Sequence, residues 1–213
     1  MCRQIFQKEF ISRIKNKRVA LVGPAPSVSG SGAGPWIDSF DLVARVNMGV
    51  FDIASLPHDV GTRTDILYGN RFVQKRLSYD EEIIAKFSPW FSDTLFCFKG
   101  HSCLKKSHFS PTAKKLGLSS FRIVKKDLLL SNPNMGFLAI KDLLKAKPKL
   151  LHLTGFTFYQ GKEVYHGKYL GGHDNKIHQG QNRMFSKFCR IYRKSSNLSV
   201  DPTLKAMIEK TKN

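Results

Sequence analysis

The sequence predicts an α/β fold, a sandwich in which helices pack against a mostly parallel β-sheet. Two observations carry this prediction. Short apolar runs rich in β-prone residues alternate along the chain with segments of helical periodicity, which is the pattern of strand–helix–strand units. The chain has 213 residues, of which 41% are hydrophobic and 16 are Phe. It can therefore bury a substantial core, and we expect residues 1–213 to form one domain.

The first predicted element is an amphipathic helix within residues 1–17, because apolar side chains recur there at helical spacing. These side chains are Ile5, Phe6, Phe10, Ile11 and Ile14. We expect this helix to pack on the domain, with attachment to a membrane surface as the alternative.

Six strands are predicted from short apolar runs bounded by polar or turn-forming residues. They cover residues 18–22, 41–46, 65–68, 94–98, 121–124 and 150–154. Helices are predicted at residues 36–40, 78–87, 134–145, 180–193 and at the end of the chain. The helix at 134–145 ends before Pro148, since proline disfavours helical backbone in the residue preceding it. A Gly/Pro/Ser-rich loop at 23–35 and a basic loop at 99–115 are candidates to border a site.

The chain is strongly basic, with 35 Lys and Arg against 16 Asp and Glu and a net charge of +19. Such a surface attracts nucleic acids, anionic lipid headgroups, or acidic glycans and nucleotides, although a solubility role fits the same charge. The sequence contains no signal peptide and no apolar run long enough to span a membrane. Its four cysteines are too few and too scattered for a disulfide scaffold. We therefore expect a cytoplasmic protein, with peripheral contact to an anionic membrane as a further expectation.

The ends of the predicted strands supply the first candidates for a site, because ligands bind beyond the carboxyl ends of strands in a parallel sheet. Gly23 follows the strand at 18–22 and opens a loop with three more glycines, which lets the backbone approach a ligand. The loop lacks the GxGxxG and GxxxxGK[ST] patterns, so dinucleotide-binding and P-loop enzymes are disfavoured. Asn47 closes the next strand, at the rim of the same crevice.

Two further segments are candidates that also have a plain structural explanation. Arg63 and Asp65 lie in a segment dense in capping and turn residues, where the two side chains could simply pair. Residues 132–136 precede a predicted helix that Asn132 or Asn134 would cap. The first amides of this helix would bind an anion, although an ordinary helix start explains the same pattern.

The last candidate is a histidine segment, with His166, His173 and His178 close in sequence. His173, Asp174 and His178 carry metal-ligating groups, yet their spacing matches neither a helical i,i+4 pair nor a zinc pattern with paired cysteines. We therefore expect no metal site. A glycine-flanked histidine on a loop suits a general base, because imidazole titrates near neutral pH.

In their order and spacing, these segments resemble the motifs of glycosyltransferase family 29, the sialyltransferases. The family's long motif resembles residues 19–27, 37–47 and 61–65, and its short motif resembles residues 133–136 and 151–156. Its closing motif resembles His173 with His178, and a third, shorter motif resembles residues 165–167. The resemblance covers a core at residues 18–188. It implies a Rossmann-like α/β/α sandwich, the GT-A-like variant typical of sialyltransferases, in a short microbial or viral type of member without a membrane anchor.

The resemblance also implies which residues bind the donor nucleotide. Ser27, Asn47 and the loop after Gly23 would face the cytidine monophosphate (CMP) part of a nucleotide-sugar donor. Gly155 and Phe156 would border the cytidine.

Further roles that the resemblance implies concern the sugar and the reaction. Asn134, Met135 and Gly136 would hold the donor sugar and its carboxylate through backbone amides. His173 would take the proton of the acceptor hydroxyl as it attacks the anomeric carbon with inversion, and His166 would stabilise the departing phosphate. The family needs no metal ion, and no other cofactor is expected.

The chain departs from the family's pattern at four positions. Pro24 stands where the long motif has Asn, Asn134 and Met135 replace a Ser/Thr pair of the short motif, and His178 replaces the closing Glu. The disulfide that links the long and short motifs in animal members has no matching cysteines here, which agrees with a reducing compartment. These departures leave the donor open between CMP-sialic acid and another CMP-activated acidic sugar such as CMP-Kdo.

The sequence thus predicts an inverting, metal-independent glycosyltransferase. It would move sialic acid or a related acidic sugar from a CMP-activated donor to a hydroxyl of an oligosaccharide, glycolipid or glycoprotein. One alternative is a basic nucleic-acid-binding module, in which residues 183–194 with Phe185, Phe188 and Tyr192 would form the binding face; nucleic acid is the less expected partner. The other is a degenerate family member that binds a nucleotide without turnover.

Overall fold

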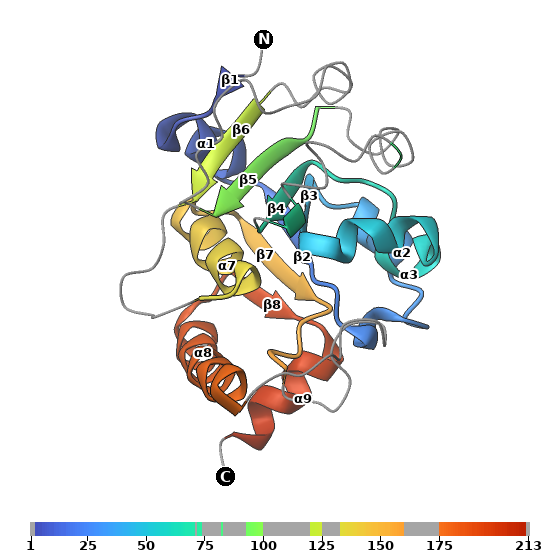
Figure 1. The fold of residues 1–213 in the computed structure, drawn as a ribbon, viewed down its shortest axis with the longest axis vertical. Coiled ribbons are helices and arrows are strands. Elements are labelled where there is room, and N and C mark those ends of the chain that lie inside the picture. The colour runs from blue at the N-terminus through green and yellow to red at the C-terminus, as the bar shows by residue number, and fades with distance from the viewer. Residues whose placement is uncertain are drawn as a thin grey trace.

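The computed structural model describes residues 3–70, 72–73, 82, 93–99, 120–124, 133–159 and 175–211. Its centre is an eight-stranded sheet in the order β1-β6-β5-β4-β3-β2-β7-β8, and all the described pairings are parallel (Figure 1). The strands are β1 (Arg3–Gln4), β2 (Arg18–Val22), β3 (Leu42–Val46), β4 (Ile66–Gly69), β5 (Leu95–Lys99), β6 (Ser120–Val124), β7 (Leu150–Thr154) and β8 (Leu198–Val200). The predicted Rossmann-like α/β arrangement with a parallel sheet is confirmed.

Helices cover the two faces of the sheet in two separate layers. The first layer holds α1 (Gln7–Ile14), α7 (Met135–Lys145), α8 (Asn175–Lys194) and α9 (Pro202–Lys210). The second layer holds η1 (Pro26–Val28), α2 (Gly34–Asp38), η2 (Asn47–Ala54) and α3 (Pro57–Val60). Within the described residues, none of the helices combines the length and the apolar character that a membrane-spanning segment requires.

The alternation of side chains along each strand divides the core into two parts. In β2, Val19 and Leu21 contribute to the core beneath α1, α7, α8 and α9, whereas Ala20 and Val22 contribute to the core beneath α2 and α3. Strands buried on both faces read as continuous apolar runs, which is why their positions could be predicted from the sequence.

The six predicted strands all occur, and their bounds differ from the prediction by at most one residue at either end. The predicted helix at 134–145 is α7, with Asn134 at its N-cap. The helix predicted from residue 180 begins earlier, at Asn175, so Gly180 lies inside α8 and not at its start. The sequence did not predict the short edge strands β1 and β8, nor η2 and α3. Apart from Glu82, which is helical, the predicted helix at 78–87 lies outside the described residues, as does the basic loop after Lys99.

The N-terminal segment differs in part from the predicted single helix. Residues Arg3–Gln4 form a strand that pairs with β6, and the helix begins only at Gln7. Phe10 and Ile14 are fully buried against the sheet, so the helix packs on the domain. Phe6, predicted on the buried face, is 69% exposed. It occupies the extended N-cap position, where the side chain leaves the apolar stripe of the helix.

Candidate functional site

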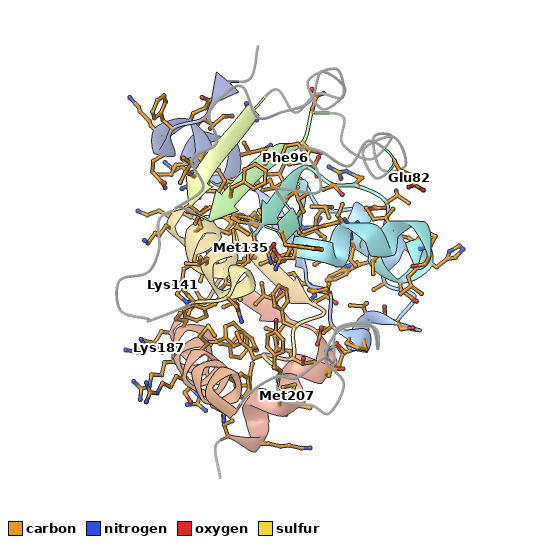
Figure 2. All side chains as sticks on the ribbon, in the orientation of Figure 1. Glu82, Phe96, Met135, Lys141, Lys187 and Met207 are labelled. Atoms are coloured by element: carbon orange, nitrogen blue, oxygen red, sulfur yellow. The ribbon has the colours of Figure 1, made fainter. Side chains whose placement is uncertain are left out.

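A hollow of about 500 Å³, counting the part open to solvent, lies beyond the carboxyl ends of β2, β3 and β7. It is lined by Pro24, Ala25, Val46, Asn47, Asn134, Met135, Gly136, Gly155, Phe156, Thr157, Phe158 and Tyr159. Met135, labelled in Figure 2, marks the start of α7 between the two helix layers. This is where a parallel sheet ordinarily binds its ligands.

The floor of the hollow is a close contact between two backbone segments. β2 and β7 pair in register, and the Gly23 amide donates to the Thr154 carbonyl at 2.8 Å. The Ala25 amide then donates to the Gly155 carbonyl at 3.0 Å. A Cβ on Gly23 would collide with the Gly155 carbonyl and lie 2.9 Å from the Phe156 ring. Glycine is required here because the two segments pass too close for a side chain.

Asp201 holds this floor from behind. One of its carboxylate oxygens accepts the Gly155 amide at 2.8 Å, and the other accepts the Leu204 amide at 2.7 Å as the N-cap of α9. Gly155 has a φ of +73°, a conformation that few other residues tolerate, so the bond fixes an unusual turn. Asp201 could not be predicted from the sequence, since a helix cap gives no sign that the same side chain reaches a residue 46 positions earlier.

The start of α7 forms one wall of the hollow. The Asn134 side chain accepts the Phe137 amide at 2.8 Å and so caps α7. Of the two predicted capping residues, Asn132 and Asn134, the cap is therefore Asn134. As at any helix start, the first amides, here those of Met135 and Gly136, have no acceptor within the helix. A Cβ on Gly136 would lie 2.9 Å from the Phe156 ring, so glycine lets that ring pack on the helix start.

Three non-glycine residues that line the hollow have left-handed backbone. Asn47 has a φ of +50°, and its side-chain oxygen accepts the Asn70 amide at 2.9 Å. Phe158 and Tyr159 have φ values of +49° and +59°, which are rare for aromatic residues. Phe158 is anchored by stacking on Phe188 of α8, with ring centroids 4.8 Å apart. Strained residues held by packing are typical of binding sites.

The far end of α7 is fixed to the sheet by a buried ion pair between Asp142 and Arg122 of β6. Asp142 also accepts the Tyr68 hydroxyl at 2.9 Å. Burial, followed by the charge of Asp142, raises the pKa of Tyr68 well above its ordinary value, so this hydroxyl stays protonated and donates. The group lies away from the hollow and serves to hold the helix whose start forms its wall.

Six of the predicted site residues line the hollow together: Asn47, Asn134, Met135, Gly136, Gly155 and Phe156. Gly23 lies directly behind them in the floor. Ser27 does not line the hollow; its hydroxyl oxygen is buried in η1 and has no hydrogen-bond partner among the described residues. His166 and His173 lie outside the described residues, so their roles stay predictions.

The other glycines of the loop at 23–35 have a different role from the predicted approach to a ligand. The amides of Gly30 and Gly32 donate to the Asp59 carboxylate at 2.9 and 2.8 Å, which ties the loop to α3. These two bonds, that from Gly32 first, lower the pKa of Asp59. A Cβ on Gly34 would lie 2.6 Å from the His58 carbonyl oxygen, so this glycine lets α2 and α3 pack closely.

The segment at 61–65 lies at the amino edge of the sheet, away from the hollow. Arg63 donates to the Asp38 and Phe40 carbonyls at 2.8 and 2.7 Å, and it pairs with Asp65 at 3.1 Å. The predicted Arg63–Asp65 pair is thus confirmed. Asp65 in turn accepts the Val43 amide at 2.7 Å, which ties the turn to the start of β3.

None of the described residues that line the hollow is Lys, Arg, Asp or Glu. Within the described part of the chain, no three His, Cys, Asp or Glu side chains gather in a cluster that could ligate a metal. The polar groups of the described lining are therefore backbone amides, Asn, Thr and Tyr side chains and the positive end of the α7 dipole, which suit an anion. Aromatic rings provide the apolar surface.

A model of glycosyltransferase family 29 (sialyltransferase) matches residues 3–170. Among solved structures, the chain is similar to a mammalian sialyltransferase in complex with Gal-beta-1-3GalNAc-ortho-nitrophenol, at 15% identity, a TM-score of 0.48, and coverage of 91% of this chain and 72% of the other. A further mammalian sialyltransferase structure gives 15% identity and a TM-score of 0.46 over 87% of this chain and 69% of the other. No curated protein matches the sequence.

Proposed function

Since the chain belongs to glycosyltransferase family 29, we propose that its hollow binds a CMP-activated acidic sugar, which the protein transfers to a glycan hydroxyl. Membership makes the protein a sialyltransferase-like glycosyltransferase. The observation that carries the finer proposal is the meeting of three separate motif segments in one hollow. Asn47, the α7 start and the Gly155–Phe156 turn are far apart in sequence and line the same space.

In this proposal the start of α7 receives the negative charge of the donor. The amides of Met135 and Gly136 would donate to the sugar carboxylate, and the helix dipole of α7, which is 11 residues long, would favour the charge. Asn134 cannot turn its side-chain oxygen to the sugar without giving up the Phe137 amide that it caps. The backbone would therefore replace the hydroxyls that other family members place here.

The aromatic part of the hollow would hold the cytidine. The Phe156 ring packs against the positions of both Gly23 and Gly136, so it is fixed before a ligand arrives. The ring is only 7% exposed, so it would border the cytidine as part of a pre-formed wall and not as an open stacking platform. Asn47, which follows β3 and lines the same hollow, would contact the ribose or phosphate.

We propose an inverting reaction with His173 as the base. The acceptor hydroxyl oxygen forms a bond to the anomeric carbon while the bond from that carbon to the phosphate oxygen breaks. The hydroxyl proton passes to His173, and CMP leaves with the bonding electrons, assisted by His166. This scheme needs neither a metal ion nor another cofactor.

The test is to follow CMP release from CMP-sialic acid and, separately, from CMP-Kdo, each with a glycan acceptor. We expect turnover of one donor, and loss of that turnover by about 100-fold or more in His173→Ala, as for removal of a general base. His58→Ala, which changes an exposed histidine of α3, is the matched control and should keep the wild-type rate.

Three outcomes would contradict the proposal in different ways. Absence of binding and turnover with both donors would overturn the donor class. Turnover of the His173→Ala variant at the wild-type rate would show that His173 is not the base, while the proposed transferase activity would stand. Binding of CMP without turnover would identify the degenerate member.

The nucleic-acid module finds no comparable support. Phe185 and Phe188, which would have to stack on bases, are 6% and 0% exposed and belong to the core.

A further inference from the structure

Among the helices that the structure describes, Lys and Arg occur in one of the two layers. The helices of the first layer carry twelve Lys or Arg, two each in α1, α7 and α9 and six in α8, against three acidic residues. One of those three, Asp142, is buried in its ion pair with Arg122. The described helices of the second layer carry no Lys or Arg and three Asp. Over the described helices the positive charge therefore lies in the first layer, an asymmetry that general solubility does not require.

Within the first layer, the cations form rows along two neighbouring helices. On α8 they recur at i, i+4, i+7 and i+11, which places them on one face over about 16 Å. These residues are Arg183, Lys187, Arg190 and Lys194. On α7, Lys141 and Lys145 are one turn apart. We call these six residues the α7–α8 face; Lys141 and Lys187 lie on the same side of the molecule in Figure 2, away from the sheet. The Asn134 amide donates to the Met184 sulfur at 3.3 Å, so the two helices are in contact.

The opposite side of α8 is committed to the core. Met184, Phe185, Phe188 and Cys189 are all at most 6% exposed. The helix therefore cannot turn an apolar face outward, and any contact made by the α7–α8 face is electrostatic. From residue 182 onward, α8 exposes no large apolar side chain, and neither does α7, so the face lacks the stacking surface that single-stranded nucleic acid requires.

One exposed aromatic residue does occur in this layer. Phe6, at the start of α1, is 69% exposed and is followed by Lys8 and Arg13, which are also exposed. An aromatic side chain beside cations is the combination that binds the headgroup region of an anionic bilayer, because the ring enters the interface while the cations pair with headgroups.

We propose that the α7–α8 face, together with Phe6, docks the protein on bilayers that contain anionic lipids. Each cation near such a surface strengthens binding by about fivefold, and salt screens the effect within about 10 Å. The start of α7 is also a wall of the hollow, so docking would bring the hollow close to lipid-borne glycans. The docking itself does not depend on the proposed transferase activity.

The experiment is flotation of the full chain with lipid vesicles. We expect binding to phosphatidylcholine vesicles containing about 30% phosphatidylserine, little binding to phosphatidylcholine alone, and release at about 0.5 M NaCl. The test variant combines Arg183→Glu, Arg190→Glu and Lys194→Glu, all exposed positions. It should bind anionic vesicles at least about tenfold more weakly. A second variant, Phe6→Ser, should weaken binding severalfold and leave the salt dependence in place.

The matched control is Lys17→Glu, Lys147→Glu and Lys149→Glu. These three exposed lysines lie together at the amino edge of the sheet, where the Lys149 amide donates to the Lys17 carbonyl at 2.8 Å. The control changes net charge by the same amount and should bind like wild type. Equal loss in both triple variants would mean that total charge alone acts, and would overturn the proposal. So would tighter binding of a single-stranded oligonucleotide than of anionic vesicles, or no vesicle binding in a wild-type protein whose unfolding midpoint matches those of the variants.

Discussion

The carboxyl and amino edges of this sheet use parts of the same family motif in different ways. At the carboxyl edge, strand ends lead into glycines, asparagines and aromatic residues around an open hollow. At the amino edge, Asp41 accepts the first amide of β2, and Arg63 and Asp65 join the starts of β3 and β4. These three side chains bond to the protein itself and so act in folding. A match to a family motif therefore does not by itself assign a residue to binding.

The largest effect that would test this contrast is expected for Gly155→Ala at the carboxyl edge. The φ of +73° disfavours alanine, and the new Cβ would lie 2.7 Å from Val28 and collide with the Gly23 carbonyl. We expect a loss of about 4 kcal/mol in the free energy of unfolding, since strain and overpacking add, together with loss of donor binding. Urea titration and CMP binding would measure both.

Gly30→Ala separates the two causes of the loss expected for Gly155→Ala, which are backbone strain and overlap of the new Cβ with its neighbours. Gly30 has a φ of +76°, yet a Cβ there would meet nothing within 4 Å. We expect a loss of about 1 kcal/mol from backbone strain alone, and unchanged CMP binding. Equal losses in the two variants would mean that the contact between Gly23 and Gly155 is not what makes glycine necessary.

The next largest effect is a loss of stability at low pH, and it tests whether the carboxyl and amino edges of the sheet unfold together. His152 of β7 lies between them, is 7% exposed, and packs edge-on against Trp36 at 4.6 Å. Burial lowers the pKa of His152 from 6.5 to about 4, while nearby Asp201 opposes the shift. The unfolded chain therefore takes up a proton first as pH falls. Stability should be complete above pH 6.5 and decline by about 3 kcal/mol toward pH 4.

His152→Gln isolates this titration from that of the carboxylates. The amide can keep the bond to the Ser199 hydroxyl, which the imidazole makes at 2.9 Å, and it cannot ionise. Urea titrations at several pH values should give a flatter curve for this variant than for wild type between pH 6.5 and 4. Parallel curves would show that His152 titrates normally in the folded protein.

At the amino edge, Arg63→Ala should lower stability without touching the hollow. The variant loses the bonds to the Asp38 and Phe40 carbonyls and the pair with Asp65. Because the side chain is partly exposed, we expect a loss of about 2 kcal/mol, with KM for the sugar donor unchanged. Arg63→Lys should recover part of the loss. A raised KM at full stability would place the segment in the binding site after all.

The fold could be predicted from the sequence wherever local pattern and packing agree. β2 and β7 are apolar runs bounded by lysine or proline on one side and glycine on the other, and their positions were predicted without error. β1 is only Arg3–Gln4 and β8 only Leu198–Val200, too short for any pattern. Their strand backbone comes from pairing with β6 and β7, and so depends on tertiary contacts.

The candidate site was predicted where a motif marks it and missed where only the fold creates it. Asn47, Gly136 and Phe156 belong to motif segments and line the hollow. Phe158 and Tyr159 line it as well, but nothing in the sequence indicates that two aromatic residues will adopt left-handed backbone. That conformation depends on the packing of Phe158 against α8.

The smallest predicted effect, and the most selective, is that of Asp201→Asn. The amide keeps one oxygen for the cap of α9 and loses the acceptor for Gly155, so stability should fall by only about 1 kcal/mol. The Gly155 turn would loosen, and KM for the donor should rise severalfold with kcat nearly unchanged.

Asp59→Asn is the matched control, because Asp59 also accepts two amides, those of Gly30 and Gly32, away from the hollow. It should lose similar stability and keep its KM. Equal changes in KM for the two variants would mean that KM follows stability and not the position of the Gly155 turn, and the distinction between the carboxyl edge and the rest of the fold would then fail.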